Sequence, residues 1–130
     1  MNQRRRKFIL ALGSNANPGL SMAKAKQLLQ KQLGPVAFSP VITTDAIGMV
    51  AEPFCNCLAY GMTLKTADEL TSLLKQMERD CGDMPALRAT HQIVMDIDLL
   101  LLGRKKYHPD NWNRDYIRQL LAMPTSKDTE

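Results

Sequence analysis

The chain has 130 residues, enough for a single domain with one hydrophobic core. Apolar residues make up 45% of the sequence, which indicates a globular protein and excludes a disordered one. The net charge is +4, and four basic residues lie together in the segment Arg4–Lys7, a tip too short to indicate nucleic-acid binding by itself. We expect a basic tip at residues 1–6, a folded domain at 7–122 and a disordered tail at 123–130.

The environment of the protein is indicated by two features of the sequence. The apolar run after the basic tip is too short for a secretory signal and leads directly into "SNANPG", and no stretch approaches the length of a transmembrane helix. Three cysteines, Cys55, Cys57 and Cys81, without the spacing of a disulfide framework indicate a reducing compartment. We therefore expect cytoplasmic localisation and no membrane partner.

Residues 7–46 predict a strand, a helix and a second strand, in that order. The run "KFILALG" is apolar and ends in glycine, which is typical of a short buried strand. Apolar residues between Leu20 and Leu33 follow helical spacing, and Gly34-Pro35 ends that helix. The segment "VAFSPVITTDA" is rich in β-formers, and Pro40 places it at a sheet edge or at a bulge.

Residues 54–123 predict two further strands, each followed by a helix. The segment "FCNCLAYGMTLKT" alternates as a central strand does, and Thr66 and Glu69 then form a capping box ahead of an apolar helix stripe. After a polar loop at 83–92, "IVMDIDLLLLG" is typical of another buried strand. A second loop, at 107–115, leads to a final helix over "YIRQLLAM".

The resulting order is β-α-β-β-α-β plus a C-terminal helix. This order predicts an α+β protein with the ferredoxin-like arrangement, a four-stranded antiparallel sheet with two helices on one face. The fold hosts many functions, so it does not by itself indicate an activity.

Two carboxylates, Asp96 and Asp98, interrupt the most apolar strand, in the segment "MDIDLLLLG". Alternation along a strand places both on one face, opposite Ile97. Burying two acids is costly unless a positive charge compensates them, and oxygen ligands at this spacing suit one or two Mg²⁺ ions. For an isolated Asp-x-Asp pair, salt bridges to Arg or Lys at an exposed strand end are the more common explanation.

Three motifs together resemble those of the 6-hydroxymethyl-7,8-dihydropterin pyrophosphokinase family. They are "FILALGSN" near the start, a helix ending in "KQMERDCG", and "MDIDLLLLG", and the likeness covers residues 7 to 118. The resemblance implies the same ferredoxin-like fold. It also implies a folate-pathway reaction in which pyrophosphate moves from ATP to the pterin hydroxymethyl group, leaving AMP.

The resemblance implies that Asp96 and Asp98 hold two Mg²⁺ ions and that one of them polarises the attacking hydroxyl. We predict Arg88 as a third catalytic residue, because it can contribute positive charge in the loop before them. It implies a pterin site formed by Thr44, Ile47, Phe54, Asn56 and Tyr116. In that site Asn56 hydrogen-bonds the polar edge of the pterin, and the two aromatic rings sandwich it. From the residues alone, Phe54 is better explained by core packing, whereas an amide in an apolar strand needs partners.

The resemblance further implies an ATP site formed by Glu78, Leu99, His108 and Arg114. The segment "YHPDNWNRDY" is similar to the family's His-x-Asp-x-x-Asn-Arg-x-Phe, which places His108 and Arg114 near phosphates. Taken alone, Glu78 is almost equally compatible with a solvated helix acid, and a lone histidine is more often structural or exposed.

The loop before the aspartate pair departs from the family pattern. Family members carry several arginines there, whereas this loop has Asp83 and Pro85 at two of the arginine positions. Its positive charge is limited to Arg88 and His91. Because charge stabilisation is a large catalytic term in phosphoryl transfer, this loop raises the alternative of a catalytically impaired homologue that binds pterin or nucleotide.

A third hypothesis, a nucleic-acid module using Arg4–Lys7, requires exposed aromatic rings on the sheet, and the sequence offers few. We favour the active Mg²⁺-dependent pyrophosphokinase. We expect small-molecule partners only (the pterin and ATP), no nucleic acid, and a monomer or weak dimer.

Overall fold

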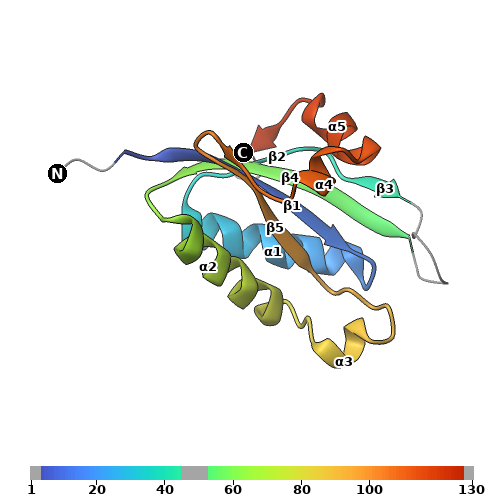
Figure 1. Cartoon of the computed structure of the whole chain (residues 1–130). Helices are drawn as coiled ribbons and strands as arrows, with labels where there is room; N and C mark the ends of the chain where they lie inside the picture. The colour runs from blue at the N-terminus through green and yellow to red at the C-terminus, as the bar shows by residue number, and fades with distance from the viewer. Residues whose placement is uncertain (1–3, 45–52, 128–130) are drawn as a thin grey trace.

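The structure is a computed structural model, and it describes residues 4–44 and 53–127 (Figure 1). Its strands are β1 (Arg6–Ser14), β2 (Ala37–Phe38), β3 (Ile42–Thr44), β4 (Phe54–Thr63), β5 (Asp96–Leu102), β6 (Lys105–Lys106) and β7 (Ser126–Lys127). Its helices are α1 (Pro18–Leu33), α2 (Ala67–Asp80), α3 (Pro85–Arg88), α4 (Pro109–Trp112) and α5 (Asp115–Leu121).

The strands form one sheet in the order β6-β5-β1-β4-β2-β7, with β3 also paired to β4, and every pairing is antiparallel. The predicted α+β, ferredoxin-like arrangement is confirmed. The sheet has more strands than the four predicted, because the chain at Pro40 leaves the sheet and divides the second predicted strand into β2 and β3. The short strands β6 and β7 extend the two edges.

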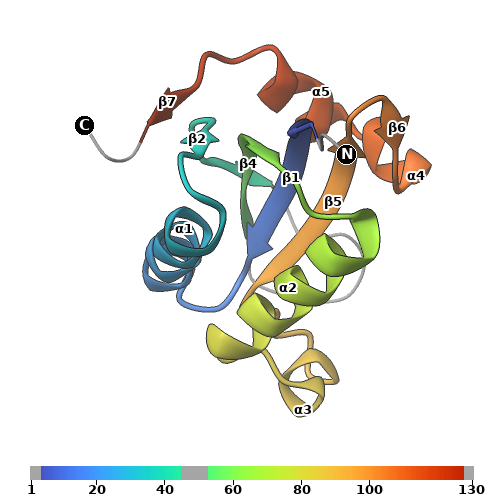
Figure 2. The same ribbon diagram turned by 90° about the vertical axis from the view of Figure 1, so that its left-hand side faces the viewer.

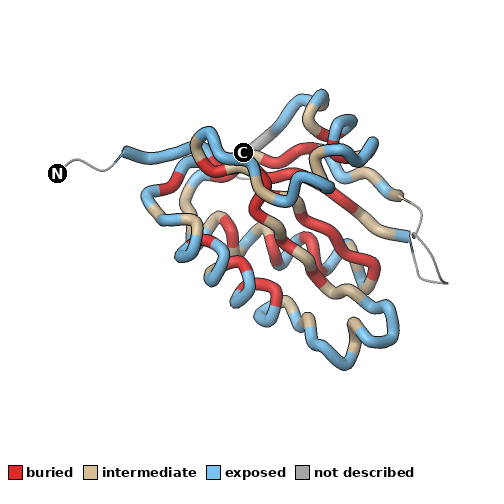
Figure 3. The backbone as a smooth tube through the Cα atoms, in the orientation of Figure 1, coloured by how far each residue is buried: buried red, intermediate tan, exposed pale blue. Residues whose placement is uncertain are grey.

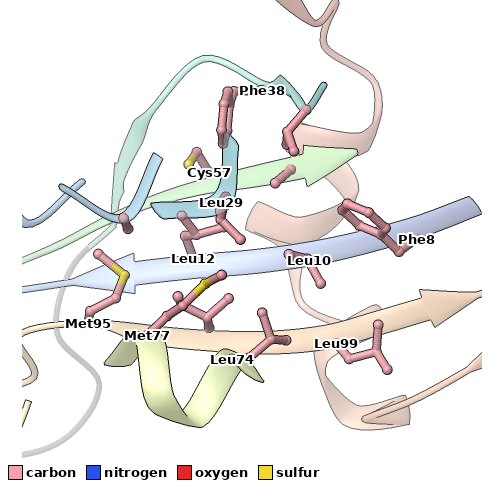
Figure 4. Packing of buried hydrophobic residues seen from close by; sticks show 14 of the residues in the cluster. Phe8, Leu10, Leu12, Leu29, Phe38, Cys57, Leu74, Met77, Met95 and Leu99 are labelled. Carbon is pink, nitrogen blue, oxygen red and sulfur yellow. The ribbon is translucent and has the colours of Figure 1, made fainter. Parts of the chain in front are cut away.

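Helices α1 and α2 lie side by side on one face of the sheet (Figure 2). The predicted capping box begins α2: Thr66 Oγ1 accepts from the Glu69 amide at 3.1 Å, and Glu69 Oε1 accepts from the Thr66 amide at 2.9 Å. Figure 4 shows the main hydrophobic core, in which side chains from the sheet meet those of both helices; examples are Leu10, Leu12, Leu29, Leu74, Met77 and Leu99.

The other face of the sheet carries α4 and α5 (Figure 2). A second, smaller cluster packs there, built on Ile9, Leu58, Leu100, Ile117 and Leu120. The pairing register of β5 against β1 shifts between Ile9 and Leu10, so that Ile9 pairs with Leu101 and Leu10 with Leu99. Alternation sends Leu99 and Leu100 to opposite clusters, and the extra residue of the bulge lets Leu102 join Leu99 in the main core.

Buried residues follow the strands and the inner sides of the helices (Figure 3). Both segments predicted as loops contain one short helix each, α3 and α4, and both of these helices begin with proline, whose fixed φ suits the first helical turn. Within the tail for which we expected disorder, β7 pairs with β2. No helix of the described residues is long and apolar enough to cross a membrane.

Candidate active site

A cavity of about 250 Å³ opens on the face that carries α4 and α5, where β1 ends and where β4 and β5 begin. It brings together seven of the residues predicted for the site: Thr44, Phe54, Asn56, Asp96, Asp98, Arg114 and Tyr116. They come from β3, β4, β5 and the segment at α5, which lie far apart in the sequence. The antiparallel sheet therefore assembles most of the predicted pterin site beside the aspartate pair.

The floor of the cavity is formed by small residues of β1. Gly13 pairs with Asn56 on one side and with Asp96 on the other, and Ala11 pairs with Asp98. A Cβ atom on Gly13 would lie 3.2 Å from Asn56 Oδ1. A side chain at this position would therefore press on the asparagine, which explains the glycine of the "ALGSN" motif in packing terms.

Asn56 is buried and its amide is held in place. Its Nδ2 donates to Thr44 Oγ1 at 2.9 Å and lies 3.5 Å from the carbonyl oxygen of Phe54. Among the described residues, no hydrogen bond from a donor to Asn56 Oδ1 is formed. The carbonyl end of this amide is therefore oriented and available for a donor on a ligand.

The two aspartates lie on one face of β5, as the alternation predicts, and line the same cavity. Burial raises the pKa of Asp98 above its usual value, and the neighbouring charge of Asp96 raises it further. Two carboxylates held this close are stabilised by a cation between them. Among the residues described here, no third His, Cys, Asp or Glu joins them, so a Mg²⁺ ion would complete its shell with water or phosphate oxygens, as Mg²⁺ commonly does.

Arg88 lies beside the aspartates but outside the lining of the cavity. Its Nε donates to Asp83 Oδ2, and its Nη2 lies 3.3 Å from the carbonyl oxygen of Met95 and 3.4 Å from Asp96 Oδ1. The other oxygen of Asp83 accepts from the amide of Val94 at 3.1 Å. We call the segment between α2 and β5, residues 81–95, the arm. Arg88 thus holds the arm against the start of β5.

Asn15, the last residue of "ALGSN", fastens the same arm from the other side. Its side chain donates to the carbonyl of His91 at 2.9 Å and accepts from the amide of Ile93 at 2.7 Å. His91 itself has a φ of 65°, which L residues rarely adopt. The motif residue therefore holds a strained turn just ahead of the aspartate pair.

Three residues predicted for ATP do not line the cavity. Leu99 is buried in the main core below α1 and α2, and His108 is exposed at the start of α4. Glu78 is 5% exposed and its Oε2 accepts from the Ile97 amide at 2.8 Å, from the helix side of β5. Burial raises the pKa of Glu78 to about 7, and the charge of Asp96 adds to the shift. Their roles toward ATP stay predictions, and Ile47 lies outside the described residues.

Two residues of this region were missed by the sequence reasoning. Asn111 of α4 lines the cavity, and Asp83 anchors Arg88. Nothing in the sequence distinguishes Asn111 from other polar loop residues. Asp83 was visible only as the residue standing where an arginine was expected.

Comparisons with known proteins identify the family of the chain. The family model of 7,8-dihydro-6-hydroxymethylpterin-pyrophosphokinase matches residues 9–125. The chain is similar to the mitochondrial folate synthesis bifunctional protein of Arabidopsis thaliana, with 26% identity in an alignment 136 positions long that covers 93% of this chain. The alignment covers 24% of that protein, so the chain spans about a quarter of the length of this curated relative. The chain belongs to the 7,8-dihydro-6-hydroxymethylpterin-pyrophosphokinase family.

Proposed function

We propose that the chain transfers a pyrophosphoryl group from ATP to 6-hydroxymethyl-7,8-dihydropterin. In this reaction the hydroxymethyl oxygen bonds to the β-phosphorus, the bond from the β-phosphorus to the oxygen bridging to the α-phosphate breaks, AMP leaves, and the hydroxyl proton is lost. The family membership supports the reaction class. The observation that carries the proposal is the single cavity in which Asn56 and the aspartate pair face the same space.

The pterin side of the cavity suits a flat, polar, conjugated ring. Phe54 and Tyr116 both line it, and aromatic rings favour stacking on such a ligand. Asn56, oriented by Thr44, offers a carbonyl oxygen to the N–H groups of a pterin. These contacts fix the orientation of the hydroxymethyl group, and positioning is a main source of rate in phosphoryl transfer.

Asp96 and Asp98 would hold Mg²⁺, which when bound neutralises the charge of the triphosphate. Either carboxylate also polarises the attacking hydroxyl. Arg114, exposed at the rim and lining the cavity, adds a positive charge that reaches toward the phosphates. These groups together act on the charge that develops during transfer.

The direct experiment supplies purified protein with Mg²⁺, ATP and the reduced pterin and measures AMP. We expect AMP that depends on all three additions. Folded protein that releases no AMP above the no-pterin background contradicts the proposal.

One observation favours a second candidate, a homologue that binds pterin but is impaired in transfer. Arg88, the arginine nearest to the aspartates in the arm, is already engaged by Asp83 and Asp96. Calorimetry with the pterin and a non-hydrolysable ATP analogue separates the two candidates. Pterin binding without AMP release supports the second candidate, and absence of pterin binding contradicts both.

A further inference from the structure

Two charged residues of the arm before β5, Asp83 and Arg88, form a chain of contacts that ends at Asp96 of the candidate metal pair. Arg88 contacts both acids, through Nε on Asp83 and through Nη2 on Asp96. The guanidinium is a rigid plane with several N–H groups, so Nε and Nη2 can contact two different acids at once. Arg88 therefore links a residue outside the cavity to a residue that lines it.

The two ends of this chain differ in strength. The Asp83 side chain is 8% exposed, and its second oxygen is held by the amide of Val94 at 3.1 Å. The Asp96 side chain is 39% exposed, and its contact with Arg88 Nη2 is long, at 3.4 Å. The first contact is short and sheltered from water, whereas the second is stretched and open to solvent, where ion pairs are weak.

This asymmetry decides what happens when another cation approaches Asp96. A divalent cation on Asp96 competes with the guanidinium for the same carboxylate and repels it. Arg88 would yield the weak contact first, because its contact with Asp83 does not involve the metal pair. The freed Nη2 would then be available to another anion beside Asp96, while Asp83 prevents the side chain from moving away.

We propose that Asp83 is a positioning residue that keeps Arg88 beside the cavity when a divalent cation displaces Arg88 from Asp96. Arg88 is the counter-charge of Asp96 before the cation binds and a partner for the phosphate oxygens afterwards. This inference deepens the proposed function and rests on it for the phosphate step, but the displacement itself requires only the cation. An acid at position 83, where the family pattern has an arginine, is thereby given a role.

The displacement is tested by titrating the full chain with Mn²⁺ alone and reading free Mn²⁺ by electron paramagnetic resonance. Arg88→Gln removes the competing charge, and we expect about threefold to fivefold tighter Mn²⁺ binding, the range of an exposed ion pair. Asp83→Asn leaves Arg88 with Asp96 as its main partner, and we expect binding about threefold weaker. In the Arg88→Gln background, Asp83→Asn is expected to change binding less than about 1.5-fold, because no guanidinium is left to redirect.

Arg79→Gln is the matched control, because Arg79 contacts Gln76 on the exposed side of α2. It is expected to leave Mn²⁺ binding unchanged, and circular dichroism checks the folding of each variant. Arg88→Lys replaces Arg88→Gln if the latter does not fold, and is expected to bind Mn²⁺ more tightly than the original protein because Lys has no second nitrogen to place beside Asp96 while the first contacts Asp83.

Three results overturn the proposal: Arg88→Gln with unchanged or weaker binding, Asp83→Asn with the same effect in both backgrounds, or no Mn²⁺ binding by any variant. The phosphate step is read separately as the KM for ATP, which Asp83→Asn is expected to raise about threefold with little change in kcat. If the Mn²⁺ results hold and the AMP assay is negative, the proposed function fails while the displacement stands.

Discussion

The two faces of the sheet are covered by helices to different extents, and the cavity lies where coverage is incomplete. On one face, α1 and α2 bury the apolar side chains of β1 and β5, from Phe8 and Leu102 at one end to Leu12 and Ile97 at the other. On the opposite face, α5 packs over Ile9 and Leu58, and the cavity lies beyond, around Gly13. The same strands thus stabilise the fold through one face and form the site through the other.

This difference explains why acids are tolerated within an apolar strand. Ile97, between the two aspartates, is 3% exposed and packs with the helices, while both aspartates turn to the cavity. Residue alternation lets one strand serve two environments without conflict. Substitutions on the core face and on the cavity face should therefore have different effects on stability and on activity.

The largest effect is expected from Asp98→Asn, on the cavity face. The loss of one metal-binding carboxylate should lower kcat/KM for AMP release about 100- to 1000-fold, the scale of removing a major electrostatic contact. Stability should stay equal or rise, because burial and Asp96 raise the pKa of Asp98 and its charge is costly. Thermal unfolding and the AMP assay measure both quantities. Asp68→Asn, in the exposed first turn of α2, is the control; a similar loss of activity in it would refute the assignment.

Leucine truncation compares the two faces directly. Leu10→Ala, in the main core, is expected to cost about 3–5 kcal/mol of unfolding free energy, and Leu120→Ala, under α5, about 2–3 kcal/mol. Both side chains are fully buried, but the second lies in the smaller cluster. Urea denaturation measures the difference. A larger loss for Leu120→Ala would show that the α5 face carries more of the stability than its packing indicates.

Gly13→Ala tests the floor of the cavity with one added methyl group. The new Cβ would lie 3.2 Å from Asn56 Oδ1, so the amide must shift and the KM for the pterin is expected to rise about tenfold. Gly19→Ala is matched to it, because a Cβ at Gly19 meets nothing within 4 Å. An unchanged KM in Gly13→Ala would mean that Asn56 does not orient the pterin.

The smallest effect is expected from Glu78→Gln in α2, whose side chain contacts β5 from the helix side. The pKa of Glu78 is raised by burial to about 7, so its charge costs stability as pH rises from about 4.5 to about 7. The neutral amide avoids this cost and still accepts from the Ile97 amide. Above pH 7 the variant is expected to be about 1–2 kcal/mol more stable, after allowance for solvent screening, and equal to the original protein below pH 4.5.

Urea denaturation at pH 5 and pH 8 provides the measurement for Glu78→Gln. Asp80→Asn, at another acid of α2 whose side chain contacts Gln76 on the exposed side, is the matched control for an acid-to-amide change in this helix. A stability difference for Glu78→Gln that is the same at both pH values would contradict the assigned cause.

Much of the fold was predictable because it depends on local patterns. The capping box of Thr66 and Glu69 spans three residues, and the alternation of β5 spans seven, so both are visible without the rest of the chain. The split at Pro40 was expected as an edge or a bulge, because proline lacks the amide that a central strand needs. The helices α3 and α4 were not predicted, because each is a single turn within a polar segment.

In the candidate site too, some features could be predicted from the sequence and others depend on tertiary contacts. Asp96 and Asn56 were chosen from motif and polarity, and the register of β1 brings both to Gly13. The burial of Glu78 and the anchoring of Arg88 by Asp83 were not visible in the sequence. The first depends on how α2 packs against β5, and the second on how the arm folds just ahead of that strand.

By itself the sequence determined the order of the elements, the face on which the two aspartates lie, and the family to which the chain belongs. Only the tertiary structure decided that the face under α4 and α5 stays open around Gly13, that Glu78 is buried against Ile97, and that Asn15 holds the turn at His91. The physical reason is the distance along the chain over which each contact acts. Helix caps and strand alternation arise between near neighbours, whereas Asn15 and His91 are separated by 76 positions and meet only when the sheet is formed.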